Sequence, residues 1–176
     1  MSALKLNIGS RIRADGWKTF DIEEGPEVDY VGDCCDLSQF AEGAIDTIYA
    51  SHVLEHVSYQ DDMLAALKEW FRVLVPGGTV IISVPDFDLL CRLFLHPSNG
   101  IEQRFHIMRV IFGGQMSPTD FHSVGLTLEF LSWYLETAGF RDIRRVDDLG
   151  IFKDCSALEL GGIPISLNVT ARKPES

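Results

Sequence analysis

The chain has 176 residues, of which 46% are hydrophobic, and this is enough for one domain with its own core. Its 26 acidic residues outnumber its 15 lysines and arginines and give a net charge of -11. This charge disfavours binding to nucleic acid or anionic membranes and favours a small, neutral or cationic partner. The alternative is that the acidic surface serves solubility. The sequence shows no secretory leader, no apolar run of about 18 residues and no C-x-x-C pair, so we expect four reduced cysteines in a cytoplasmic protein.

Seven short runs rich in apolar and β-branched residues are expected to be strands. Several are apolar almost throughout, which is typical of strands covered on both faces, as in a parallel sheet. Such a sheet needs helices on each side, so the pattern predicts an α/β fold. In chain order the expected strands are 4–9, 17–22, 28–33, 45–50, 79–84, 141–146 and 166–172.

Helical periodicity is clearest between the fourth and fifth expected strands. Apolar residues recur at helical spacing along 58–75, and a Pro-Gly-Gly turn at 76–78 is expected to end the element. The resulting β-α-β unit predicts two parallel strands with a right-handed crossover. A second helix is expected over 127–138, with Gly139 as its stop.

A bulky segment, 87–125, separates the fifth strand from this second helix. It contains helix-like pieces at 88–95 and 101–112. An insertion at the carboxyl edge of a sheet is where a substrate lid would lie. The alternative is that the segment packs on the domain or forms the face of a homodimer. We treat 1–176 as a single domain that includes this insertion.

The residues that follow the fourth strand spell His52-Val-Leu-Glu55-His56, or H-x-x-E-H, a spacing used by zinc hydrolases. Here the motif follows directly on a strand, at the edge where open α/β sheets bind ligands. A zinc hydrolase also needs a third ligand, and none is evident among the downstream acids. We therefore expect no metal at this motif and a structural role for His56, and keep the hydrolase as an alternative.

Taken together, the ordered pieces resemble class I S-adenosylmethionine-dependent methyltransferases, most closely a small bacterial subgroup of the type 11 kind. The resemblance covers nearly the whole chain. It implies a Rossmann-like seven-stranded sheet with helices on both faces, an antiparallel last strand and a helical insertion after the fifth strand. The pieces that carry it are ASHVLEH at 50–56 and RVLVPGG at 72–78, together with KLNIGSR, FDI, VGDCCDLSQF and LEFLSWYLETAGF in this order.

Candidate cofactor residues follow the first three strands. Gly9 ends the first strand, where a missing side chain lets backbone N–H groups approach a ligand. Asp21, followed by Ile22, ends the second strand; it is suited to accept from both ribose hydroxyls, or it is a solvated strand-end acid. By resemblance, Asp33 accepts from the adenine amino group and the Cys34 N–H faces a ring nitrogen. The alternative for Asp33 is an Asx-type turn with Asp36.

The resemblance also places Ser51 and His52 beside the methionine part of S-adenosylmethionine. Ser10 and Arg11 stand where the family commonly has a second glycine, so the glycine-rich loop is incomplete, and Arg11 is a candidate partner for the methionine carboxylate. Only 12 positions separate the first glycine from the acid of the second strand, against about 20 in the dinucleotide-binding fingerprint. The first crossover helix is therefore expected to be short or absent.

Methyl transfer requires in-line positioning and sometimes a base. His122, near the end of the insertion, is our candidate catalytic base, with Asp120 to orient it; the alternative is that His122 only fixes the start of the next helix. The leading hypothesis is methyl transfer to an unidentified small molecule. The second is a degenerate member that binds the cofactor, or nothing, as an interaction module. An NAD-dependent dehydrogenase is disfavoured because G-x-G-x-x-G is lacking.

Overall fold

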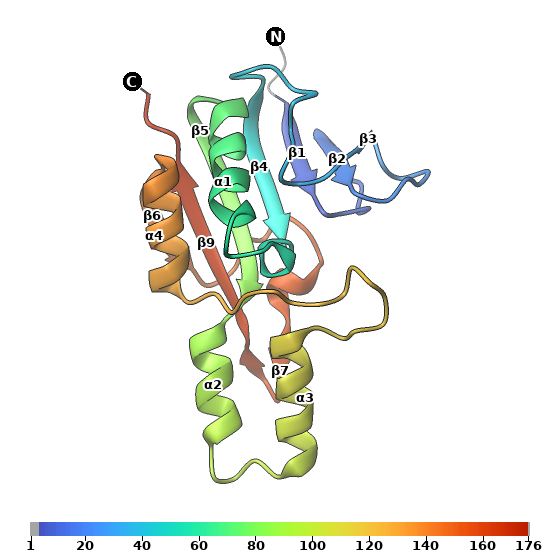
Figure 1. Cartoon of the computed structure of the whole chain (residues 1–176), viewed down its shortest axis with the longest axis vertical. Coiled ribbons are helices and arrows are strands. Elements are labelled where there is room, and N and C mark those ends of the chain that lie inside the picture. The colour runs from blue at the N-terminus through green and yellow to red at the C-terminus, as the bar shows by residue number, and fades with distance from the viewer. Residues whose placement is uncertain (1–3, 176) are drawn as a thin grey trace.

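A seven-stranded sheet forms the centre of the molecule. The computed structural model describes residues 4–175, and the strand order is β3-β2-β1-β4-β5-β9-β6 (Figure 1). Each strand overlaps one of the seven expected runs. Strand β9 runs antiparallel to both β5 and β6, so the predicted antiparallel last strand is confirmed. The strands are β1 (Lys5–Ile8), β2 (Trp17–Asp21), β3 (Tyr30–Val31), β4 (Ile45–Ser51), β5 (Leu74–Pro85), β6 (Arg141–Val146) and β9 (Ser166–Arg172).

One face of the sheet is apolar and carries two helices. α1 (Asp62–Val73) and α4 (Leu128–Ala138) pack against each other on this face (Figure 1). α1 buries Met63, Leu67 and Trp70, whose spacing of three to four residues puts them on one side of the helix. The strand residues that join them in the main core are Leu6, Ile8, Phe20, Ile45, Ile48, Ala50, Val80, Ile82, Val84, Leu167, Val169 and Ala171.

The other face of the sheet differs from the expectation of helices on both faces. The connections β1–β2 and β2–β3 are residues 9–16 and 22–29, and neither contains a helix. Each has only eight residues, whereas a crossover with a helix needs about 10–12 or more. The chain therefore covers one face with helices and leaves short loops where the second helical layer was expected.

Polar side chains lie on this second face. Since side chains alternate along a strand, Tyr49 and Asn168 point away from α1. The Tyr49 ring packs at 4.7 Å from Phe152, and Asn168 Nδ2 donates to the carbonyl of Ser156 at 3.1 Å. Ser156 belongs to the short 3-10 helix η2 (Cys155–Ala157). The segment before β9 thus supplies a thin, partly polar cover in place of a helix.

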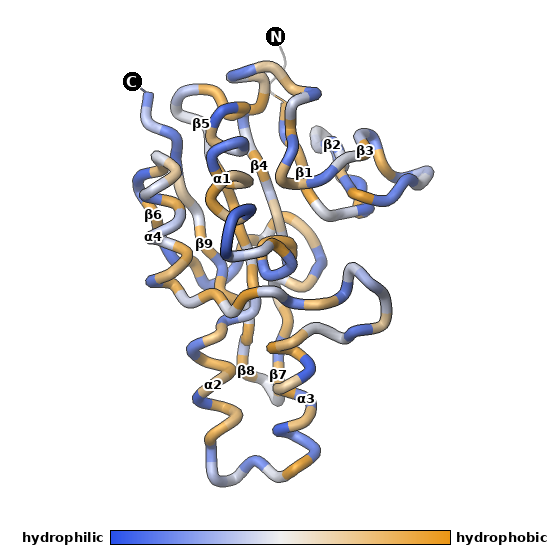
Figure 2. The backbone as a smooth tube through the Cα atoms, in the orientation of Figure 1, coloured by the Kyte–Doolittle hydropathy of each residue, from blue (hydrophilic) through white to orange (hydrophobic). Residues whose placement is uncertain are grey.

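The predicted helical insertion after β5 is present as two helices, α2 (Phe87–Leu95) and α3 (Ile101–Phe112). They form a hairpin beyond the end of the sheet (Figure 1), and orange and blue alternate along both (Figure 2), as expected for helices with one buried side. Their small core is made of Leu90, Ile107 and Ile165. The last of these follows a two-stranded hairpin, β7 (Glu159–Leu160) and β8 (Ile163–Pro164).

The end of α1 differs from the sequence-based expectation. The helix ends at Val73, and Leu74 is already extended, with φ -70 and ψ 141, so the Pro-Gly-Gly turn at 76–78 lies in β5. Leu74 pairs with Ile45, and the register then shifts before Thr47, which accommodates a proline that has no N–H to donate. Among residues 4–175, no helix has the length and apolarity that a bilayer crossing requires.

Candidate functional site

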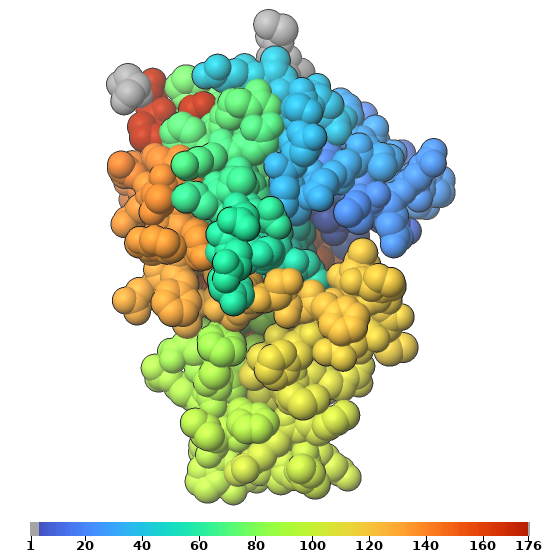
Figure 3. Space-filling model, in the orientation of Figure 1, coloured from blue at the N-terminus to red at the C-terminus, as the bar shows by residue number. Residues whose placement is uncertain are grey.

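A cavity of about 700 Å³ lies at the carboxyl edge of the parallel strands, within the usual range for small-molecule sites. Figure 3 shows a hollow between the blue surface of β1–β3 and the gold surface of the loop after α3. Ser10 and Ser51 lie beside this cavity without lining it. The predicted cofactor residues that line it are Gly9, Arg11, Asp21, Ile22, Asp33, Cys34 and His52.

Gly9 is required by the fold as well as by its position at the cavity. Its φ is +69, and a Cβ atom there would lie 2.4 Å from Cγ2 of Val53. Its N–H donates to the carbonyl of Phe20 at 2.7 Å, and the Ser10 N–H approaches the same carbonyl at 3.4 Å. The expected donation from these two amides to a ligand therefore competes with an existing contact between β1 and β2.

Asp21 is placed as the sequence predicts, at the end of β2 with a side chain 15% exposed. Its Oδ1 accepts from the Glu23 N–H at 2.9 Å, whereas Oδ2 has no partner among the described residues. Arg11 pairs with Glu23 and lies 3.7 Å from Asp21 Oδ1. The guanidinium expected to meet a ligand carboxylate is thus engaged with two acids of the chain itself.

Asp33 and Cys34 follow β3 in a tight turn. Asp33 Oδ1 accepts from the Cys35 N–H at 2.8 Å, so an Asx turn is formed with Cys35 rather than with Asp36. The Cys34 carbonyl accepts from Trp70 Nε1 at 2.8 Å, while no described residue accepts from the Cys34 N–H. The hydrogen bond with Cys35 and burial raise the pKa of the Cys34 thiol. The thiol therefore stays protonated at neutral pH, and the Cys34 N–H is the donor that is left free.

His52 adopts a backbone conformation that is rare for a residue with a side chain, with φ +56. Its Nε2 lies 3.1 Å from Ser166 Oγ, and the Ser166 hydroxyl donates to the Cys155 carbonyl at 2.7 Å, so the ring nitrogen must donate to Ser166. Its Nδ1 lies 3.1 Å from Glu55 Oε1. The strained turn therefore fixes the ring between β9 and the acid of the H-x-x-E-H motif.

Glu55 and His56 were not among the predicted site residues, although the motif that contains them was noticed. They lie in the 3-10 helix η1 (Leu54–His56). Glu55 is 1% exposed, and its backbone carbonyl accepts from Ser123 at 2.7 Å. His56 lines the cavity, and its Nδ1 lies 3.1 Å from the Phe121 carbonyl. The loop after α3 is thus hydrogen bonded to η1.

His122, the predicted base, is half-buried behind the cavity wall. Its Nδ1 lies 3.2 Å from the Ile111 carbonyl, and its ring stands edge-to-face with that of His56 at 4.8 Å. Burial lowers the pKa of His122, partly opposed by the Glu55 carboxylate. The expected contact with Asp120 is not formed, because the Asp120 carboxylate accepts from the Met116 N–H at 3.1 Å instead.

The reason for expecting no metal at the H-x-x-E-H motif no longer holds. No third ligand was evident in the sequence, but the fold brings His122 to the motif. One ligand atom from each of Glu55, His56 and His122 lies within 4.8 Å of the other two. The missing signal is a contact between residues 66 positions apart, which no local spacing encodes.

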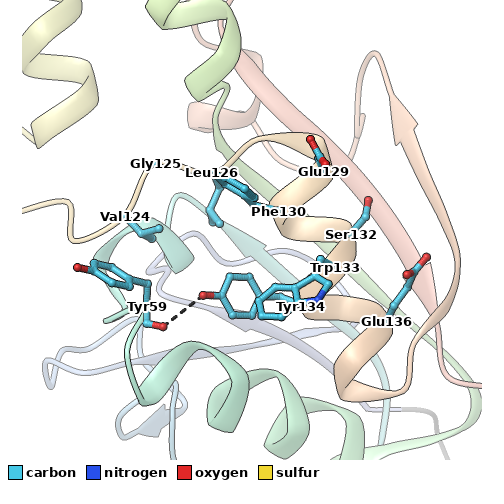
Figure 4. A pocket seen from close by; sticks show the side chains of 10 residues that line it. All are labelled: Tyr59, Val124, Gly125, Leu126, Glu129, Phe130, Ser132, Trp133, Tyr134 and Glu136. Carbon is cyan, nitrogen blue, oxygen red and sulfur yellow. Dashed lines mark hydrogen bonds between the residues drawn. The ribbon is translucent and has the colours of Figure 1, made fainter.

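A second cavity, of about 660 Å³, lies along the outer side of α4 (Figure 4). Four of its ten lining residues are aromatic, and the Tyr134 hydroxyl donates to the Tyr59 carbonyl at 3.2 Å across it. Its charged groups are Glu129 and Glu136, and none of the predicted cofactor residues lines it. With no converging donors or bases, it offers less chemistry than the cavity at the carboxyl edge.

The family comparison matches residues 12–82 to the methyltransferase domain. This part of the chain is therefore similar to a methyltransferase domain. The matched range begins within the loop after β1, past Gly9, Ser10 and Arg11. It covers both acids at the ends of β2 and β3, the H-x-x-E-H motif, α1 and most of β5. No curated protein sequence matches this chain.

Solved structures share the fold of this chain. A SAM-dependent methyltransferase from Archaeoglobus fulgidus matches with a TM-score of 0.62 and 17% identity, over 97% of this chain and 86% of that one. The Burkholderia thailandensis 1,6-didemethyltoxoflavin-N1-methyltransferase, solved with 1,6-didemethyltoxoflavin and S-adenosylhomocysteine, matches with a TM-score of 0.60 and 20% identity, over 98% and 71%. A possible exported protein from Bordetella parapertussis matches with a TM-score of 0.59 and 14% identity, over 98% of this chain but only 62% of its own length.

These matches bear on the sequence-based predictions. The predicted class I methyltransferase fold is confirmed. The match of residues 12–82 to a methyltransferase domain agrees with the predicted resemblance to SAM-dependent methyltransferases. The Archaeoglobus protein is SAM dependent and the Burkholderia protein holds S-adenosylhomocysteine, which agrees with the predicted cofactor. The comparisons do not identify a methyl acceptor. The roles of individual site residues therefore remain predictions.

Proposed function

We propose that this methyltransferase binds S-adenosylmethionine in the cavity at the carboxyl edge and transfers its methyl group to a small-molecule acceptor. The observation that carries the proposal is the convergence of Asp21, Asp33 and Cys34 on one cavity from the ends of two neighbouring strands. Asp21 Oδ2 is available as an acceptor for ribose, and the Cys34 N–H as a donor to an adenine nitrogen. These residues fit the nucleoside part of the cofactor.

The charge of the cavity supports a cationic ligand. Four carboxylates line it against one guanidinium, that of Arg11, which already pairs with Glu23. An excess of negative charge in a concave site attracts a ligand with a positive sulfonium and an ammonium group. The carboxylates are those of Asp21, Glu23, Asp33 and Asp62.

When bound, the cofactor would supply a methyl group on a positively charged sulfur. The chain's own task is then to hold the acceptor atom in line with this methyl and to remove a proton where the acceptor carries one. His122 remains our candidate for that proton: its Nδ1 is held by a carbonyl, so its Nε2 is the nitrogen that would take it. His56 lines the cavity, and its ring contacts that of His122.

Calorimetric titration tests the cofactor assignment. S-adenosylmethionine and S-adenosylhomocysteine should each bind at one site per chain, and NAD should not. Asp21→Ala should weaken the binding, whereas Asp88→Ala, which removes an exposed acid on α2, should not. No heat from either cofactor form with the folded wild-type protein would reject the proposal.

A binding module without catalysis remains the second candidate. It is favoured by one observation: the Gly9 and Ser10 amides already serve the β1–β2 contact, and Arg11 is already paired with Glu23. These are the groups that were expected to hold the methionine end. Tight binding of the cofactor without transfer to any of a broad panel of small oxygen and nitrogen nucleophiles would favour this candidate.

Other sequence-based expectations remain predictions. A lid role for 87–125 is supported by Ser117, Thr119 and Phe121, which line the cavity from the loop after α3. That 1–176 forms a single domain, that it forms a homodimer, and that it meets neither nucleic acid nor membrane in its function are likewise part of the proposal. A cytoplasmic location is supported by four unpaired cysteines.

A further inference from the structure

Glu55, His56 and His122 form a cluster of metal-binding groups at the wall of the cavity. One ligand atom from each lies within 4.8 Å of the other two. The cluster is not an accident of surface crowding, because the first residue is buried and the other two are half-buried. The loop that carries the second histidine is hydrogen bonded to η1 through the Glu55 carbonyl, which accepts from Ser123 at 2.7 Å.

The Glu55 carboxylate lacks the partners that a buried charge requires. The residue is 1% exposed, and neither carboxylate oxygen has a hydrogen-bonding partner among the described residues. His52 Nδ1 approaches Oε1 to 3.1 Å, but the contact lacks the direction of a hydrogen bond. A buried carboxylate without a partner is strongly unfavourable, so a cation belongs beside it.

Both histidines of the cluster are held in the form that binds a metal. Nδ1 of His56 lies 3.1 Å from the Phe121 carbonyl, and Nδ1 of His122 lies 3.2 Å from the Ile111 carbonyl. A carbonyl only accepts, so each Nδ1 carries a proton, and Nε2 is the nitrogen left for a metal ion. Metal-binding histidines use this arrangement, with the second ring nitrogen donating to a backbone carbonyl.

We propose that Glu55, His56 and His122 bind one divalent first-row transition-metal ion of the zinc class. Two imidazole nitrogens and one carboxylate oxygen are a donor set that suits such an ion, and three protein ligands leave a position for water. His52, fixed through Ser166, lies beside the carboxylate, with Nδ1 at 3.1 Å from Oε1, and limits where the carboxylate can move. The site does not depend on the proposed methyl transfer, since all three ligands come from the chain itself.

Metal loading of the untagged protein tests this proposal without any methyl acceptor. The protein is stripped with a chelator, dialysed, loaded with Zn²⁺ or Co²⁺ and desalted, and its metal content and Co²⁺ absorption spectrum are then measured. One ion per chain is expected, with the visible bands of nitrogen and oxygen coordination. Far less than one ion per chain after loading would overturn the proposal.

Variants separate this ligand set from adventitious binding. His56→Ala, His122→Ala and Glu55→Gln should each weaken Zn²⁺ binding by about 100-fold or more, while His52→Ala should weaken it by about 10–100-fold. His106→Ala, which removes an exposed histidine on α3, is the matched control and should bind like the wild type. Glu55→Gln keeps the shape of the side chain, so it remains informative if an alanine variant fails to fold. Unchanged binding in His122→Ala would reject the assignment.

Discussion

The cavity has two sides that hold their polar groups in different ways. The acid side is formed by the loops after β1, β2 and β3. The histidine side is formed by Glu55, His56 and His122. On the acid side, Asp21 and Asp33 each accept from an amide two residues along the chain. On the histidine side, the partners come from segments 66 residues apart, and the buried carboxylate has none of its own.

The difference teaches which side tolerates change. An Asx turn is complete within three residues, so the acid side keeps its local geometry when distant parts of the chain move. The histidine side exists only while the loop after α3 stays bonded to η1. We therefore expect substitutions on the acid side to alter cofactor affinity, and substitutions on the histidine side to alter turnover.

The largest effect is expected for His122→Ala. Turnover should fall by about 10²–10⁴, the usual range for a lost general base. Affinity for S-adenosylhomocysteine should stay within about twofold, because His122 does not line the cavity. The measurement is transfer of a labelled methyl group once an acceptor is identified, beside calorimetry and the His106→Ala control. Near-normal turnover would exclude a catalytic role for His122 and would contradict the expectation that the histidine side controls turnover.

The same preparation distinguishes the two roles proposed for His122. A base needs a vacant Nε2, whereas a metal ligand has that nitrogen occupied. If turnover and metal content fall together, the imidazole acts through the ion. If turnover falls in protein that never held a metal, the imidazole acts as the base.

A smaller effect is expected for Asp21→Ala on the acid side. Loss of a charged acceptor for the ribose hydroxyls should cost about 1.5–3 kcal/mol, which corresponds to a roughly ten- to hundredfold weaker binding of S-adenosylhomocysteine. Asp21→Asn keeps the hydrogen bond from the Glu23 N–H, so its affinity for S-adenosylhomocysteine should lie between those of the wild type and of Asp21→Ala. Unchanged affinity in a folded Asp21→Ala variant would remove this residue from the site.

Gly9→Ala probes the contact that joins the two sides. A Cβ at a φ of +69, only 2.4 Å from Val53, should lower the free energy of unfolding by roughly 1–3 kcal/mol. A double-mutant cycle with Val53→Ala, measured by urea denaturation, tests whether contact with Val53 causes this loss. The Val53 substitution should cost less in the Gly9→Ala protein than in the wild type, and strictly additive losses would contradict a collision.

The smallest effect is expected in acid, at Asp29 on the acid side. The hydrogen bond from Lys18, and then that from the Thr19 N–H, lower the pKa of Asp29 to about 2. Because the folded pKa lies below the unfolded value, the contribution is complete above about pH 4 and is lost as the pH falls towards 2. After allowance for solvent screening it amounts to about 1 kcal/mol. Urea midpoints of Asp29→Asn should therefore differ from the wild type at pH 5 and converge at pH 2, and a constant difference would contradict the ion pair.

The same division explains how much could be predicted from the sequence. The strands and helices were predictable because an apolar run or a helical period is a property of neighbouring residues, as in α1 and β4. Asp21 and Asp33 were located because a strand end fixes where the next residue lies. The contact of His56 with His122 was not predictable, since it depends on how the insertion returns to the sheet.

Two further misses have the same origin. The end of α1 was placed at the Pro-Gly-Gly turn because both residue types stop helices, yet pairing of Leu74 with Ile45 draws 74–78 into β5. Helices on both faces were expected from the family resemblance. The eight-residue connections after β1 and β2 are too short to supply them, and that count was available in the sequence.

The position of β9 sets the order in which the sheet can be completed during synthesis. β9 is inserted between β5 and β6 and pairs with both, so β6 has no neighbouring strand until residues 166–172 have left the ribosome. Strands β1 to β5 pair through earlier segments and can assemble first. During that interval the growing chain exposes the edge of β5, an apolar strand, and β9 is the segment that ends this exposure.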